Sequence, residues 1–250
     1  MKKNMLLPLL TLLMVSCVEK AQTKGMDAQQ IVDEAITVSG GERYRDHNTT
    51  FYFRNREYRS MNKNGKKVLQ RITFTDSMNI KDVRTHQGLK RYFNDSLISL
   101  ADSVAERYAN SVNSVHYFAR LPFGLNDPAV KKERMADVLV KGKSYYKIKV
   151  TFAQEDGGKD FDDTYIYWFD QETFKPDYLA YEFHVDGGGI RFREAFNERY
   201  FEGIRFVDYN NLKPKTKGIV LDSIDRLFET GQLELLSKIE LDSIQVDRSN

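Results

Sequence analysis

The hydrophobic pattern predicts a first helix that begins at Asp27. Gln30 lies three residues further on, and this pair resembles a capping box, which satisfies backbone N–H groups at the start of a helix. An apolar stripe at helical spacing follows, made of Ile31, Val32, Ala35, Ile36 and Val38. Gly40 and Gly41 predict the end of the helix, because glycine adopts the left-handed conformation of a helix terminus at little cost.

Beyond the glycine pair the period of the apolar residues changes to two, which is typical of strands. Strands are predicted at 49–59, 66–75, 79–86, 89–93, 144–152, 163–170, 177–185, 190–200, 204–210 and 233–246. In the fifth of these, Tyr146, Ile148 and Val150 alternate with Lys147, Lys149 and Thr151, so one face is expected to be wet and the other buried.

Helical spacing returns between Leu100 and Phe118, and a short helix is predicted near 221–229. The chain shows no internal repeat and no linker that would divide it. We therefore predict one domain over residues 27–250. Its fold class is α+β, dominated by strands, with a curved, unclosed antiparallel sheet (a half-barrel) packed on or around two main helices.

The amino terminus has the parts of a bacterial lipoprotein signal. Lys2 and Lys3 precede an apolar stretch that is too short to span a bilayer, and Ser16 stands before the only cysteine, Cys17. This pattern predicts a signal peptide over 1–16, lipidation of Cys17, and a polar tether over 17–26. An ordinary secretory signal with a chance cysteine is the alternative.

The net charge and the single cysteine limit the classes of partner that the protein is expected to bind. Cleavage before Cys17 removes Lys2 and Lys3 and leaves 36 basic and 36 acidic residues, so the mature chain is neutral. A neutral chain argues against a nucleic-acid partner, and acylation of Cys17 leaves no thiol for a disulfide. The predicted partner is the membrane, reached through the lipid anchor. Because Val18 and not aspartate follows Cys17, we expect the outer membrane, on its periplasmic face rather than the cell surface.

Three features taken together resemble a known family: the lipoprotein signal, the helix end at Ser39–Glu42, and the strand segments Tyr165–Trp168 and Tyr181–Gly189. They are similar to a family of small Gram-negative lipoproteins described as a domain of unknown function. In overall plan the chain is also similar to the Lol lipoprotein carriers (LolA and LolB), whose half-barrel holds acyl chains in its hollow. The resemblance implies a fold and an envelope location, and it implies no activity and no catalytic residues.

The hairpin after Tyr178 suggests a register. If Asp186–Gly189 form the turn, opposed residues have numbers that sum to 375. Phe183 then faces Phe192, and Leu179 faces Phe196, all on one side of the sheet. We predict that this side lines a hollow roofed by the helix over 101–118, which makes Leu179, Phe183, Phe192 and Phe196 candidate ligand contacts. A filled core is the alternative interpretation.

In the same register, the other side pairs His184 with Arg191 and Glu182 with Arg193. A carboxylate, an imidazole and two guanidinium groups on one surface are the best candidates for an enzyme that acts on an anionic substrate. Charge pairs of this kind are also common on a solvated sheet face.

No cofactor or metal is predicted. The histidines lack metal-ligand spacing, and the chain contains no nucleophile elbow, phosphate-binding loop or dinucleotide fingerprint. The acidic segment 155–163 lacks the spaced ligands of a calcium loop and is predicted to be a solvated hairpin loop.

Three hypotheses for function remain. We favour an outer-membrane lipoprotein without enzymatic activity that binds a hydrophobic small molecule, such as a lipid or acyl chain, in the half-barrel. This hypothesis needs only shape and aromatic side chains, which the chain has. The alternatives are an envelope enzyme that uses the face of His184, Glu182, Arg191 and Arg193, or a purely structural envelope lipoprotein.

Overall fold

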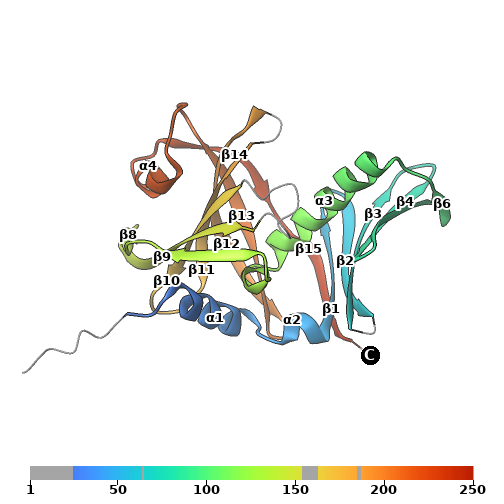
Figure 1. The fold of residues 1–250 in the computed structure, drawn as a ribbon, viewed down its shortest axis with the longest axis horizontal. Coiled ribbons are helices and arrows are strands. Elements are labelled where there is room, and N and C mark those ends of the chain that lie inside the picture. Colours follow the sequence, from blue (N-terminus) through green and yellow to red (C-terminus); the bar gives the residue numbers. More distant parts are fainter. Residues whose placement is uncertain (1–24, 64, 154–162, 185–186, 250) are drawn as a thin grey trace, which may run out of the picture.

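A computed structural model describes residues 25–63, 65–153, 163–184 and 187–249. In these residues the strands form two open antiparallel sheets, of seven and eight strands, joined side by side (Figure 1). The predicted α+β class, with an unclosed antiparallel sheet and few helices, is confirmed, although the sheet is divided into two. Within the same residues, no helix has the length and apolar character needed to cross a membrane.

The elements have the following bounds. Sheet A has the order β15 (Asp242–Arg248), β1 (His47–Phe53), β2 (Arg56–Lys63), β3 (Lys66–Phe74), β4 (Asn79–Thr85), β5 (Gly88–Phe93) and β6 (Ser96–Ile98). Sheet B has the order β14 (Leu233–Ile239), β13 (Ile204–Pro214), β12 (Gly189–Phe201), β11 (Pro176–Phe183), β10 (Thr164–Asp170), β9 (Lys143–Phe152) and β7 (Val130–Arg134), and β8 (Val138–Val140) also pairs with β9. The helices are α1 (Ala28–Ser39), α2 (Arg43–Asp46), α3 (Asp102–Ala119) and α4 (Ile224–Glu229), with 3-10 turns η1 (Phe123–Asn126) and η4 (Leu221–Ser223).

Two of the predicted strands are each divided. The strand predicted at 49–59 is a hairpin of β1 and β2, because Arg54 and Asn55 adopt positive φ angles of 50° and 57°. The strand predicted at 233–246 is β14 and β15, which belong to different sheets. The chain therefore crosses from sheet B to sheet A between Ile239 and Asp242. Strands β6, β7 and β8 were not predicted.

Helix α1 forms as its sequence predicts. Asp27 accepts a hydrogen bond from the Gln30 backbone N–H, and the Gln30 side chain accepts one from the Asp27 N–H, each at 2.9 Å. Gly40 ends the helix at a φ of 143°, where an added Cβ would lie 3.0 Å from the Tyr44 ring. Ile31, Val32, Ala35 and Ile36 of the predicted stripe pack on one face of sheet B, here called the inner face, whereas Val38 is exposed.

Sheet B is covered on both faces. On the outer face, Trp168, Tyr178 and Phe192 pack against Leu221, Ile224 and Phe228 of η4 and α4. The run Tyr165–Phe169 is therefore buried throughout, alternately against α1 and against α4. The predicted wet face of the strand over 144–152 is wrong at Lys147, which is 4% exposed because it forms an ion pair with Asp225 at 2.8 Å.

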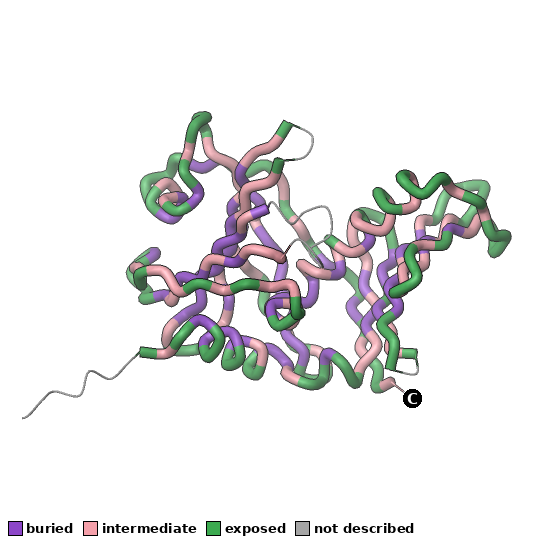
Figure 2. The backbone as a smooth tube through the Cα atoms, viewed as in Figure 1, coloured by how far each residue is buried: buried purple, intermediate pink, exposed green. Residues whose placement is uncertain are grey.

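Helix α3 leans across sheet A and ends between the two sheets (Figure 1). Its amino-terminal half is largely exposed, and its carboxyl-terminal half is more buried (Figure 2). Beneath the first half lies an ionic ladder in which Arg71 and Arg91 both bind the buried Asp82, with Arg91 stacked on Tyr108. The second half ends at the junction of the sheets, beside the buried cluster that contains Phe51, Tyr58 and Phe206.

Candidate functional site

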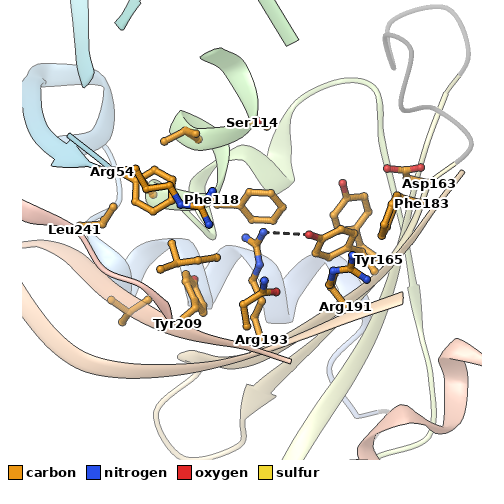
Figure 3. A pocket seen from close by; sticks show the side chains of 17 residues that line it. Arg54, Ser114, Phe118, Asp163, Tyr165, Phe183, Arg191, Arg193, Tyr209 and Leu241 are labelled. Carbon is orange, nitrogen blue, oxygen red and sulfur yellow. Dashed lines mark hydrogen bonds between the residues drawn. The ribbon is translucent and has the colours of Figure 1, made fainter. Parts of the chain in front are cut away.

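A cavity of about 400 Å³ lies where α3, the β1–β2 turn and the inner face of sheet B meet (Figure 3). Its volume is in the range of small-molecule sites, which is roughly 300–1,000 Å³. The lining comprises Phe53, Arg54, Ser114, Val115, Phe118, Ala119, Asp163, Tyr165, Tyr181, Phe183, Arg191, Arg193, Val207, Tyr209, Asn211, Ile239 and Leu241. Most of these side chains are aromatic or aliphatic.

The end of α3 is held firmly at this cavity. Arg120, the residue after the helix, donates to Ser60 Oγ at 3.0 Å and to the Tyr44 carbonyl oxygen. His116, 1% exposed, has its Nε2 3.0 Å from the Gln70 carbonyl oxygen, so this nitrogen carries the hydrogen. Burial lowers the pKa of His116 from 6.5 to about 3, which keeps the ring neutral. These contacts fix where Phe118 and Ala119 enter the cavity wall.

Arg193 projects from β12 into the middle of the cavity (Figure 3). The residue is 7% exposed, and its Cζ lies 3.7 Å from the centroid of the Phe118 ring. Its Nη2 donates to the Tyr181 hydroxyl oxygen at 3.1 Å. Its Nε and Nη1 are buried without a hydrogen-bond partner among the described residues.

The rest of the polar lining is modest. The Arg191 guanidinium lies 4.9 Å from the Phe183 ring, and its Nη1 donates to the Ile190 carbonyl oxygen at 2.9 Å. Burial raises the pKa of Tyr209, which is therefore a neutral phenol at physiological pH. The lining also contains the buried carboxylate of Asp163, so the cavity offers hydrogen-bond donors, an acceptor and apolar surface.

The predicted hairpin register is wrong. Opposed residues in β11 and β12 sum to 372, so Phe183 pairs with Gly189, and Phe192 pairs with Ala180. The difference of three is odd and therefore exchanges the faces of one strand relative to the other. The physical reason lies in the connection: β11 ends at Phe183 and β12 begins at Gly189, so the loop is longer than the predicted turn.

The new register separates the four predicted ligand contacts. Phe183 lines the cavity, and Leu179 packs on the same inner face, beneath α1. Phe192 points to the outer face, into the core under α4. Phe196 lies outside this cavity, with its ring 5.4 Å from Lys238 Nζ. The predicted common face of Phe183, Phe192 and Phe196 is therefore wrong.

The predicted polar face is also divided. Arg191 and Arg193 line the cavity, whereas Glu182 pairs with Ile190 on the outer face. His184 follows β11, and its exposed ring lies 3.8 Å from the Asp163 carboxylate. The predicted ladder of Glu182, His184, Arg191 and Arg193 does not form, because the three-residue shift places the carboxylate and the two guanidinium groups on opposite faces.

Several lining residues were missed from sequence. Ser114, Val115 and Phe118 belong to the helix that was expected to roof the hollow, and only its last two turns do so. Phe53 and Arg54 reach the cavity through a turn that was not predicted. Tyr165 and Tyr181 alternate with outer-face residues in their strands, and this alternation is the signal that points to them.

Two predicted features fall outside the description. Cys17, the signal peptide and most of the tether lie before residue 25, and the acidic segment lies within 154–162 except for Asp163. Among the described residues, no group of three or more His, Cys, Asp or Glu side chains is placed to hold a metal ion.

Comparison with known proteins gives one family and several structures. Residues 2–241 match a family of unknown function, DUF6503. None of the curated proteins matches the chain. A LolA-superfamily protein from Nitrosomonas europaea is 10% identical, with a TM-score of 0.48 over 90% of this chain and 94% of that one. A DUF1329-family protein from Desulfovibrio piger is 8% identical, with a TM-score of 0.40 over 88% and 93%. Neither likeness says what this chain binds.

Proposed function

The chain belongs to the DUF6503 family of unknown function, and we propose that it binds an apolar ligand, a lipid or an acyl chain, in the cavity at the end of α3. The observation that carries the proposal is the cavity itself. It is lined mainly by aromatic and aliphatic side chains and lies beside two clusters of buried hydrophobic residues. A few polar groups in an apolar cavity are typical of ligand sites.

The size of the cavity is suited to one chain. Burial of apolar surface contributes about 0.8 kcal/mol per methylene group, so a chain of ten buried groups has a gross gain of roughly 8 kcal/mol before the entropic cost of binding. The aromatic rings of Phe118, Tyr165 and Tyr181 pack against one another across the cavity, with centroids 5.3–6.5 Å apart. An extended acyl chain lying on these rings would displace water from the rings and from its own surface.

The proposed setting is the bacterial envelope. We propose that Cys17 is acylated and holds the domain of residues 27–250 at the outer membrane, on its periplasmic face, through the tether over 17–26. The anchor would place the cavity near membrane lipids. Replacement of Cys17 by serine should release the protein from membranes or leave the precursor uncleaved, and unchanged membrane association would refute this setting.

The competing functions have less support. An enzyme built on the four-residue polar face needs Glu182 and the two arginines on one surface, and they lie on opposite faces. A purely structural role needs a filled core, whereas about 400 Å³ lies open between α3 and sheet B.

The test uses a neutral, apolar fluorescent probe, N-phenyl-1-naphthylamine, and the soluble mature domain. Ser114 is an exposed residue of α3 at the cavity, so Ser114→Trp should fill the opening and weaken probe binding by about tenfold or more. Ser103→Trp is the matched control, because Ser103 is an exposed residue of the same helix that does not line the cavity. Absence of probe uptake by the wild type, or equal binding by both variants, would refute the proposal.

A further inference from the structure

Arg193 is a buried cation that lacks a counter-charge in the described part of the chain. Its Nε and Nη1 carry three of the five N–H groups of a guanidinium and have no acceptor. The acceptor it does have is the uncharged hydroxyl oxygen of Tyr181. Burial of a guanidinium without a carboxylate partner costs free energy, because the charge loses its hydration and gains no counter-charge.

Most of the other buried cations of the described residues pair with a carboxylate. Arg71 and Arg91 share Asp82, Lys147 binds Asp225, and Arg205 binds Glu198. Arg120 likewise has no carboxylate and a buried Nε without a described acceptor, but it donates two hydrogen bonds to oxygen atoms. Arg193 donates one, and among these cations it is the one that lines the apolar cavity at the end of α3.

Aromatic rings cover the Arg193 charge. The Phe118 ring lies over the guanidinium at 3.7 Å, and the Tyr181 ring lies 5.2 Å from its Cζ. A cation–π contact compensates a buried charge only in part, and less than a hydrogen-bonded carboxylate does. Phe118 is half-buried at the end of α3, on the opposite wall of the cavity from β12. The Phe118 ring covers one face of the guanidinium, so a shift of this ring would make room for a ligand beside Arg193.

We propose that the ligand is a single-chain amphiphile with a carboxylate head, and that Arg193 binds this head when Phe118 moves aside. The proposal rests on the proposed function, because the apolar chain occupies the same cavity. A planar carboxylate matches the fork of N–H donors that a guanidinium presents. The volume of about 400 Å³ fits one acyl chain better than the two chains of a phospholipid.

The experiment compares cis-parinaric acid with its methyl ester, which has the same chain and no charge. Both fluoresce when bound in an apolar site. The wild-type domain should bind the acid at least tenfold more tightly than the ester at pH 8, where the acid is ionised. Arg193→Met should remove this preference by weakening acid binding and leaving ester binding within about threefold of the wild type.

Arg226→Met is the matched control. Arg226 is an exposed arginine of α4 that does not line the cavity, so the preference for the acid should persist in this variant. Equal binding of acid and ester by the wild type would overturn the assignment of the head group and leave the proposed function intact. Failure of the wild type to bind the acid, the ester or the neutral probe would overturn both. The comparison on the wild type holds even if Arg193→Met does not fold.

Discussion

Replacement of Phe192 by alanine should destabilise the domain without affecting ligand binding. Phe192 is 1% exposed and packs on the outer face of sheet B, away from the cavity. Its ring centroid lies 4.6 Å from that of Phe228 in α4 and 5.6 Å from those of Trp168 and Tyr178. Truncation to alanine removes one member of this four-ring cluster, and the neighbouring strands leave little freedom for collapse.

The expected cost is about 3–5 kcal/mol, the range for a fully buried phenylalanine, because the lost transfer energy adds to the energy of the cavity left behind. A domain of this size loses roughly 2–4 °C in Tm for each kcal/mol, so the Tm should fall by about 6–20 °C. Phe183 is half-buried beside the open cavity, so Phe183→Ala should cost less, about 1–2 kcal/mol.

Thermal unfolding followed by circular dichroism measures the stability of both variants, and titration with N-phenyl-1-naphthylamine measures binding. Phe192→Ala should bind the probe within about threefold of the wild type at a temperature where it is folded. Phe183→Ala should weaken binding by about tenfold, because its ring is part of the cavity wall. The reverse pattern, in which Phe192→Ala loses binding and keeps its stability, would mean that Phe192 faces the cavity and that the register summing to 372 is incorrect.

Two further predictions concern stability. Because burial lowers the pKa of His116 to about 3, the unfolded chain binds a proton at this residue more readily than the folded chain does. The contribution of the neutral His116 ring to the free energy of unfolding is therefore complete above pH 6.5 and is lost as the pH falls towards about 3. Urea unfolding should show about 3 kcal/mol more loss from pH 7 to pH 4 in the wild type than in His116→Gln, and parallel profiles would contradict the buried neutral ring. Lys147→Met should cost roughly 3–5 kcal/mol because it leaves the buried Asp225 unpaired, and adding Asp225→Leu should restore part of the loss. A double variant less stable than the single one would rule out this origin.

Local signals made α1 predictable. The capping box, the apolar stripe and the glycine pair all act within a few residues of one another, so the sequence alone determines where this helix begins and ends. The β2–β3 and β4–β5 hairpins were predictable for the same reason, because each turn lies between two clearly alternating segments. How each element packs against the rest of the chain was harder to predict from the sequence.

The β11–β12 register shows where this limit lies. The prediction assumed that one face of the hairpin is wet, in which case all apolar residues must share the other face. In the structure α4 covers the outer face, so Phe192 and Ile190 are buried there, while Phe183 lies on the inner side. With both faces covered, the apolar pattern no longer selects one register, and the position of α4 is set by residues about 30 positions further along the chain.

The crossing of the chain from one sheet to the other could not be predicted from the sequence, for a different reason. Apolar and polar residues alternate from Leu233 to Leu241, with an interruption at Leu236, and again from Ile244 to Val246, so the segment was interpreted as one strand. It is divided because Leu241 is buried at the junction of the sheets, where its backbone N–H donates to Asp208 Oδ1 at 2.9 Å. Asp208 belongs to β13 and also binds Arg199, so the division depends on a three-dimensional arrangement of polar groups that no local pattern encodes.

The two faces of sheet B can therefore differ in what they contribute. The outer face is closed by α4, and its aromatic cluster and the Lys147–Asp225 pair are fully partnered, so it stabilises the domain whether or not a ligand is present. The inner face is closed by α1 at one end only, and at the other it retains a cavity and the Arg193 guanidinium, which pairs with no carboxylate of the described residues. An unpaired buried charge costs stability, and a closed outer core can offset that cost. A ligand carboxylate that pairs with Arg193 would remove this cost, and the free energy gained would strengthen binding of the ligand.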